Sequence, residues 1–100
     1  MPALSYASLF VLQALAQGHQ FGFDIMDATG LPSGTIYPAL RRLEALGHVE
    51  SRWEGDDAAR RASRPRRRYY ALTRQGRQQL AEAEARYRAV SKLFPRRSRT

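Results

Sequence analysis

The sequence of 100 residues contains no cysteine. This absence excludes disulfide bonds, thiolate zinc sites and cysteine nucleophiles. Histidine is scarce as well, because only His19 and His48 occur, and neither has a histidine or carboxylate partner at ligand spacing. Since no set of nucleophile, base and orienting group can be assembled, we expect no metal site, no cofactor and no enzymatic activity.

Long apolar runs are also absent. The first residues carry no basic side chain, and the apolar stretch that follows them is broken by Gln13, Gln17 and His19. A signal peptide needs a basic start and an unbroken apolar core, and a membrane span needs about 20 apolar residues. We therefore expect a cytoplasmic protein that has no membrane partner.

Positive charge is missing from the N-terminal part of the chain and abundant in the rest. No Lys or Arg precedes Arg41, yet the chain has 17 basic and 9 acidic residues and a formal net charge of +8. Such an excess favours a polyanionic partner, and double-stranded DNA is the first candidate. Sixteen of the basic residues are Arg, which suits bidentate contacts with phosphate and guanine, although high-G+C codon usage produces the same bias.

Hydrophobic periodicity predicts three helices in the first half of the chain. Residues 3–17 are apolar almost all round, so we expect a second subunit to cover one side of that helix. A brief turn joins a short helix over residues 21–30 to a third helix over residues 33–47, whose outer face carries Arg41 and Arg42. Two short helices in this order are typical of a helix-turn-helix, whose second helix reads DNA.

The start of the third helix is open to two interpretations. Ser33 is a good N-cap and would place Pro38 at the fifth helical position, whereas Gly34 as N-cap would place Pro38 at the less costly fourth position. In either case, the N-terminal residues of such a helix reach base edges in the major groove. The residues predicted to contact DNA from this helix are Ser33, Gly34, Thr35, Tyr37, Pro38, Arg41 and Arg42.

Two strands are predicted next, over residues 48–54 and 67–72, with a long polar loop over residues 55–66 between them. This hairpin holds six arginines within nine residues, a density suited to following phosphates or entering a narrow minor groove. The predicted DNA contacts of this wing are Arg60, Arg61, Arg64, Arg66, Arg67 and Arg68. Asp56 and Asp57 oppose DNA binding unless they lie at the base of the wing or pair with Arg60 and Arg61.

A long helix is predicted over residues 73–94, with Thr73 as N-cap and Pro95 after its end. Its apolar residues alternate spacings of three and four over two heptads, so we expect it to pack against the N-terminal helix and a second subunit. The predicted interface of this homodimer comprises Leu4, Phe10, Val11, Leu80, Ala83, Tyr87, Val90 and Phe94. We expect the basic tail over residues 95–100 to be disordered.

Several motifs occur in an order and spacing that resemble the PadR family of bacterial transcriptional regulators, over about Leu9 to Leu80. The motifs are Gly34-Thr35-Ile36-Tyr37-Pro38, Leu40, Arg42-Leu43-Glu44, Gly47, Tyr69-Tyr70-Ala71-Leu72-Thr73 and Gly76. The resemblance implies a winged-helix DNA-binding domain, a C-terminal dimerisation helix, and repression that is relieved by a small molecule or another signal.

Together these features predict a mostly α fold with a small β-hairpin. The expected organisation is a winged helix-turn-helix domain over residues 1–72, with its wing at about 48–72, and a dimerisation helix over residues 73–94. We expect a sequence-specific regulator, in keeping with the resemblance a repressor, that binds a palindromic operator as a homodimer.

Two other functions stay open. One is a winged-helix adapter that binds an acidic protein, and the other is a nonspecific nucleic-acid-binding protein whose wing supplies all the affinity. Neither requires the polar outer face that the third helix is expected to form from Thr35, Tyr37, Arg41 and Arg42.

The aromatic side chains have two interpretations as well. They pack in the core, or they line a flat pocket for a small aromatic effector at the dimer interface. The residues in question are Tyr6, Trp53, Tyr69, Tyr70 and Tyr87.

Overall fold

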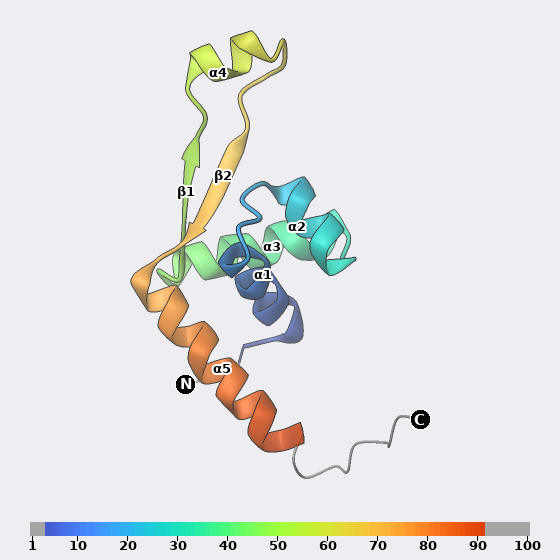
Figure 1. Ribbon diagram of the computed structural model, residues 1–100, viewed down its shortest axis with the longest axis vertical. Coiled ribbons are helices and arrows are strands. Elements are labelled where there is room, and N and C mark those ends of the chain that lie inside the picture. The colour runs from blue at the N-terminus through green and yellow to red at the C-terminus, as the bar shows by residue number, and fades with distance from the viewer. Residues whose placement is uncertain (1–3, 92–100) are drawn as a thin grey trace.

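The computed structural model describes residues 4–91, which form five helices and one antiparallel hairpin. In chain order the elements are α1 (Tyr6–Ala16), α2 (Gly22–Thr29), α3 (Ser33–Ala45), β1 (Val49–Trp53), α4 (Asp56–Arg61), β2 (Arg68–Leu72) and α5 (Arg74–Ser91). The hairpin stands out from one end of the molecule with α4 at its tip, and α5 runs toward the other end (Figure 1). The predicted fold class is confirmed. None of the described helices is long and apolar enough to cross a membrane.

Local capping decides where the helices begin. Helix α1 begins at Tyr6, later than predicted, because the Ser5 hydroxyl caps it by accepting a hydrogen bond from the Ser8 backbone N–H at 3.1 Å. The predicted cap of α5 is confirmed, since the Gly76 N–H donates to the Thr73 hydroxyl at 3.0 Å.

The start of α3 differs from both interpretations of the sequence. Pro32 is its N-cap residue, and the Pro32 carbonyl accepts the first helical hydrogen bond from Ile36 at 3.0 Å. Ser33 is therefore the first helical residue, and Pro38 is the sixth. Because proline has no N–H, the carbonyl of Gly34 loses its helical partner well inside the helix.

Helix α1 lies at the centre of the core. Its Val11 and Leu12 side chains have no exposed surface, and they form one cluster with Ile25 of α2 and Leu40 of α3. Helix α5 and strand β2 pack against other parts of α1. One helix therefore positions nearly every other element of the fold.

Burial within a single chain corrects part of the predicted subunit interface. Val11 is fully enclosed by its own chain, and Leu80 and Ala83 of α5 are buried in the same cluster. These three side chains belong to the core of the chain itself and are therefore not available to a second subunit.

The remaining residues of the predicted interface have different positions. Phe10 and Tyr87 are exposed, and Leu4 is half-buried against the core. The side chain of Val90 and the whole of Phe94 lie outside the described residues, as does the tail over residues 95–100.

The hairpin is a two-stranded ribbon, and the segment before α2 lies along the free edge of β2. Val49 pairs with Leu72 at its base, and Trp53 pairs with Arg68 at its far end. The Tyr70 N–H donates to the Gln20 carbonyl at 2.8 Å, which ties the segment before α2 to strand β2. The ribbon is thereby anchored on the helical body at its base.

The predicted polar loop over residues 55–66 contains a helix that the sequence pattern did not indicate. Helix α4 has two aspartates in its first turn and two arginines in its last turn, and this arrangement complements the helix dipole. Ala59 is its one buried residue. A charge pattern, and not an apolar stripe, marks this helix in the sequence.

Gly76 allows α5 to approach the turn between α3 and β1. The Thr73 N–H donates to the His48 carbonyl at 3.1 Å, and a Cβ atom on Gly76 would overlap that same carbonyl oxygen. A backbone carbonyl that is already hydrogen-bonded cannot move aside as a flexible side chain can. This position therefore requires glycine.

We expect Gly76→Ala to lower the free energy of unfolding by about 1 to 3 kcal/mol because it overpacks this contact. Urea unfolding measures the loss. Gly34→Ala is the matched control, since a Cβ atom there meets nothing within 4 Å and alanine is the better helix former. Equal midpoints for the two variants would contradict the close approach at Gly76.

Candidate nucleic-acid interface

The outer side of α3 has two polar flanks, and Tyr37 and Arg41 lie one turn apart on the first. Tyr37 is 38% exposed, and its hydroxyl lies over Gly22 so closely that a Cβ atom there would overlap it. Helix α2 therefore holds the Tyr37 ring in place. Arg41 is exposed and makes no ion pair or hydrogen bond among the described residues.

Arg42 lies on the second flank, which faces α1. Successive helical residues are rotated by about 100°, so Arg42 points away from its neighbour Arg41 and shares its side with Thr35, two turns earlier. The Arg42 guanidinium donates to the Ser8 hydroxyl of α1 at 3.5 Å. Thr35, Tyr37, Arg41 and Arg42 therefore lie on two flanks of the outer side of α3, and whether they contact DNA stays a prediction.

The first turn of α3 is open to solvent. Ser33 and Gly34 are exposed, and Pro38 is half-buried one turn later. Backbone N–H groups in the first turn of a helix have no partner within the helix, and they favour a negatively charged group. The end of α3 that carries the predicted reading residues is thus accessible.

Strand alternation divides the arginines that enter β2. Arg66 and Arg68 lie on the side of the hairpin that carries Trp53, and each guanidinium is 5.7 Å from the centre of the Trp53 ring. Arg67 lies on the other side, with its guanidinium 4.0 Å from the centre of the Phe21 ring. We call Ser51, Trp53, Arg66 and Arg68 the inner face of the wing.

Glu54 ties two of the predicted DNA-contacting arginines into the base of the wing tip. Arg64 donates two hydrogen bonds to the Glu54 carboxylate, one of them at 2.9 Å, and the Arg67 backbone N–H donates a third at 3.0 Å. The Arg67 guanidinium also lies 3.6 Å from this carboxylate. Hydrogen bonding from Arg64, followed by that from Arg67, lowers the pKa of Glu54 to about 2.

This clamp changes the expected role of the wing. The sequence predicted a long polar loop and six arginines that contact DNA. Arg64 and Arg67 are instead engaged by Glu54, and Arg67 is stacked on Phe21 as well. They shape the wing, and their contact with DNA stays a prediction.

A second glutamate connects the inner face of the wing to α3. Glu44 accepts a hydrogen bond from the Ser51 hydroxyl at 2.6 Å. Arg68 donates to the same hydroxyl at 2.6 Å and reaches Glu44 at 3.4 Å. This network fixes the position of the wing relative to α3, and the sequence pattern did not indicate any such role for Glu44.

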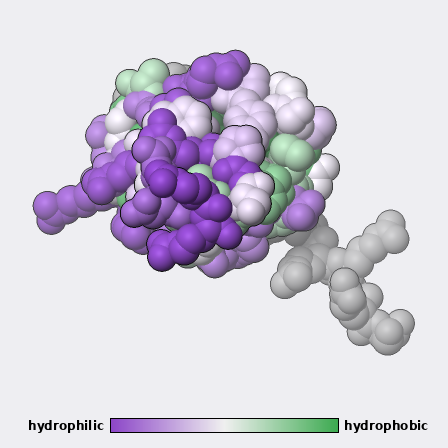
Figure 2. Space-filling model, turned by 90° about the horizontal axis from the view of Figure 1, so that it is seen from above, coloured by the Kyte–Doolittle hydropathy of each residue, from purple (hydrophilic) through white to green (hydrophobic). Residues whose placement is uncertain are grey.

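The acidic residues of α4 pair with arginines of the wing. Asp57 lies 3.8 Å from Arg60, and Asp56 lies 3.4 Å from Arg66. Arg61 is exposed beside them, without an ion pair among the residues that the structure describes. Viewed from the wing end, the molecule presents a broad cover of strongly hydrophilic side chains (Figure 2). The aspartates moderate the positive charge of this end without cancelling it.

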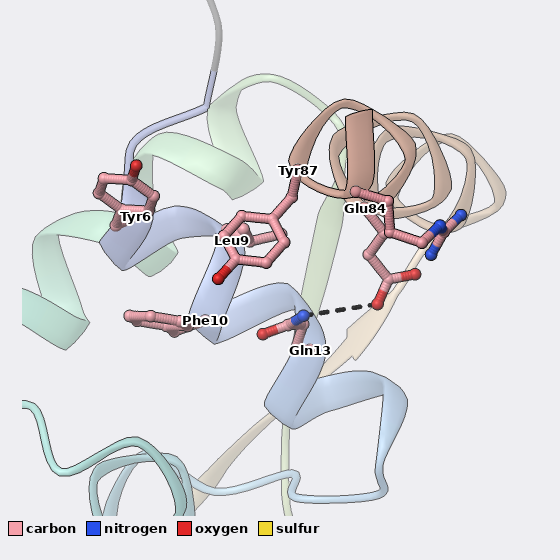
Figure 3. A pocket seen from close by; sticks show the side chains of 7 residues that line it. Tyr6, Leu9, Phe10, Gln13, Glu84 and Tyr87 are labelled. Carbon is pink, nitrogen blue, oxygen red and sulfur yellow. Dashed lines mark hydrogen bonds between the residues drawn. The ribbon is translucent and has the colours of Figure 1, made fainter. Parts of the chain in front are cut away.

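A groove of about 650 Å³ lies between α1 and α5, away from the wing. In Figure 3, Tyr6 and Phe10 of α1 and Tyr87 of α5 surround it, and Gln13 donates to Glu84 at its edge over 3.4 Å. Tyr6 and Tyr87 are 71% and 59% exposed. The groove is an aromatic surface that residues 4–91 leave uncovered.

The five aromatic residues considered for an effector pocket do not come together. Tyr6 and Tyr87 line the groove, whereas Trp53 and Tyr69 lie on the hairpin. Tyr70 is a core residue, and burial raises the pKa of its hydroxyl. No group of three or more residues suited to binding a metal ion occurs within residues 4–91.

Comparison with known proteins decides the family. The model of the transcriptional regulator PadR-like family matches residues 11–82, which span α1 to α5 and include both the recognition helix and the wing. The chain belongs to the PadR-like family. It is accordingly a DNA-binding transcription regulator, and its family consists of regulators and not of enzymes. No curated protein matches the sequence.

Solved structures share the winged-helix fold of this PadR-like regulator. A PadR family regulator from Clostridium difficile is 24% identical, with a TM-score of 0.79 over 90% of this chain and 95% of that one. A PadR-like regulator from Bacillus cereus is 24% identical, with a TM-score of 0.70 over 86% and 84%. BpsR from Bordetella bronchiseptica, whose DNA binding is regulated by 6-hydroxynicotinic acid, is 24% identical, with a TM-score of 0.71 over 92% and 67%.

We expect the clamp of this PadR-like regulator to loosen only in strong acid. Because the pKa of Glu54 is lowered from 4.5 to about 2, its contribution to stability is complete above pH 4.5 and is lost as the pH falls through about 2. The Arg67 amide proton should report this titration by NMR, with a midpoint near 2. Glu54→Gln should abolish the titration, and a midpoint near 4.5 would show that the carboxylate is not clamped.

Proposed function

We propose that the protein is a homodimeric repressor that reads a two-fold-symmetric operator. The observation that carries this proposal is the separation of two surfaces. The Tyr37 and Arg41 flank of α3 adjoins the inner face of the wing, and the aromatic groove between α1 and α5 lies on another part of the chain. One surface suits DNA, and the other suits a second copy of the chain.

Helix α3 recognises the base sequence of the operator. Its open first turn and the exposed Arg41 suit the major groove, where arginine forms a bidentate pair with guanine. Tyr37 offers a hydroxyl to a phosphate or a base edge from a ring that α2 holds in place. Ser33, Gly34 and Pro38 bring the helix backbone close to the DNA at this end.

The wing contributes affinity for DNA that does not depend on the DNA sequence. Arg60 and Arg61 at its tip, together with Arg66 and Arg68 on its inner face, are exposed and positioned to neutralise phosphates. Each neutralised phosphate releases counterions, so this part of the affinity falls steeply with salt.

The groove supplies the contact between subunits. Exposed aromatic residues on facing helices are costly in water, and burying them in an interface contributes much of the free energy of association. A second copy related by a two-fold axis presents the same groove, so the contact is self-complementary. The two recognition helices then enter major grooves about 34 Å apart. A dimer bound at a promoter represses by occupying the site.

A small aromatic effector fits the same region. A flat molecule of the size that the groove holds would pack against Tyr6, Phe10 and Tyr87 at the edge of the subunit contact. Its binding would change the angle between the subunits and hence the spacing of the two recognition helices. The compound that regulates DNA binding by BpsR, 6-hydroxynicotinic acid, belongs to this chemical class. Anisotropy of a labelled operator in the presence of aromatic acids tests this part of the proposal.

We expect Arg41→Ala to reduce the preference for operator over random DNA by about 1 to 3 kcal/mol, because it removes a base contact. The operator is first selected from a random pool, and affinities for it and for a random duplex are then compared. Arg42→Ala removes the same charge from the flank that faces α1 and should cost less specificity.

Two outcomes would contradict the reading role of α3. Equal losses on both duplexes for Arg41→Ala would favour a nonspecific nucleic-acid-binding protein. A pool that yields no enriched duplex would favour an adapter or another protein-binding role.

We expect Tyr87→Glu to convert the dimer into a monomer, because it places a charge in an apolar interface. Sedimentation equilibrium measures the change. Ala85→Glu is the matched control, since residue 85 is exposed on α5 about 200° around the helix from Tyr87. A dimer that survives Tyr87→Glu, or that is lost equally in both variants, would reject this groove as the interface.

A further inference from the structure

Trp53 is the one tryptophan of the chain, and it is 54% exposed at the far end of β1. A tryptophan in a folded domain normally buries its large apolar surface. The core is complete without it, because the hairpin side chains that reach the core are Val49, Tyr70 and Leu72 at the base of the ribbon. Packing within the described part of the chain therefore does not explain why Trp53 is exposed.

The surroundings of Trp53 are strongly cationic. Arg68 pairs with Trp53 across the ribbon, Arg66 lies two residues before Arg68, and each guanidinium is 5.7 Å from the centre of the indole ring. No described residue accepts a hydrogen bond from the indole N–H. An aromatic ring, a donor without a partner and two guanidinium groups are thus gathered within one small area.

The present partners of the two arginines are exposed carboxylates. Arg66 lies 3.4 Å from Asp56, and Arg68 lies 3.4 Å from Glu44. Exposed ion pairs of this kind contribute little to stability. A phosphate can therefore replace either carboxylate at small cost, and Glu44 keeps its hydrogen bond from Ser51 when Arg68 turns away.

Position favours a nucleic acid as the ligand. The network of Glu44, Ser51 and Arg68 places this area on the side of the wing that adjoins α3. A strand of DNA beside a major groove that contains α3 would pass along this side. The opposite side of the ribbon carries Glu50 and Arg52, which lie 4.0 Å apart and offset each other's charge.

We infer that Trp53, Arg66 and Arg68 form a phosphate-binding site on the inner face of the wing. The indole N–H donates to a phosphate oxygen, the two guanidinium groups contact the same or the adjoining phosphate, and the ring packs on the sugar between them. The inference rests on the proposed function, since it names the backbone contact through which the wing binds DNA. A site of this kind adds affinity without reading sequence.

The first test uses the emission of Trp53 in the unmodified protein. Because the chain has a single tryptophan, titration with the selected operator should change this emission and saturate at the same concentration as the anisotropy of the labelled duplex. A random duplex should give the same change at higher concentration. Unchanged emission while the duplex binds would overturn the site and leave the proposed function intact.

The second test compares two arginines that differ in the side of the ribbon they occupy. Arg66→Gln should weaken binding on both duplexes and reduce the slope of log affinity against log salt by about 1 for each subunit. Arg52→Gln is the matched control, with the same loss of charge on the opposite side, and should leave affinity and slope close to those of the original protein. Equal effects of the two variants would overturn the site.

A third variant isolates the indole. Trp53→Phe keeps an aromatic ring but removes the N–H donor, so binding should weaken about tenfold on both duplexes with an unchanged salt slope. If this variant fails to fold, the emission of the original protein and the comparison of Arg66→Gln with Arg52→Gln still test the phosphate-binding site. Loss of affinity for the operator alone would overturn a backbone role, and absence of any duplex binding would overturn the site and the proposed function together.

Discussion

The burial of α1 at the centre of the fold constrains the positions of the elements around it. Val11 and Leu12 have no exposed surface, and the side chains that enclose them come from α2, α3, α5 and the hairpin. Removal of apolar surface from water is the dominant favourable term in folding a domain of this size, so the position of α1 sets that of its neighbours. The same helix carries Phe10 into the aromatic groove and Ser8 to Arg42 of α3. In the proposed dimer, a change in how the two subunits meet at the groove would therefore reach α3 through one rigid element.

Two glutamates then decide what the arginines of the wing do. Glu54 engages Arg64 and Arg67, and the strength of this engagement is evident in the lowered pKa of its carboxyl group. Glu44 holds Arg68 more loosely, through an exposed contact that Ser51 shares. The run of arginines is thus heterogeneous, because some of its members build the wing and others face outward from it. Counting the arginines overstates the charge that the wing can direct at a partner.

The elements that the sequence predicts well are those whose apolar residues recur with a clear period. Helix α3 and strand β2 fall in this class. The cap of α5 was also predicted, because threonine is a common N-cap residue. Helix α4 escaped prediction because ion pairs and dipole complementarity hold it, and one alanine is its entire buried surface. For the candidate nucleic-acid interface, the sequence predicted only which segments form it, namely α3 and the wing. Which carboxylate each arginine meets depends on strand register and on how α1 packs against α3, and neither is encoded in the spacing of residues along the chain.

The pairing of wing arginines with carboxylates in the free protein has a consequence for specificity. If the wing binds DNA as proposed, Arg66 and Arg68 exchange Asp56 and Glu44 for phosphates, so only the difference between the two contacts contributes to affinity. That difference is the same for every sequence, because phosphates carry no sequence information. Arg41 pairs with no carboxylate among residues 4–91, so under the proposed function its interaction with a base edge would be gained in full on binding. The pairing therefore lowers the affinity for operator and random DNA by the same factor, and in the proposed complex the preference for the operator depends on the reading helix alone.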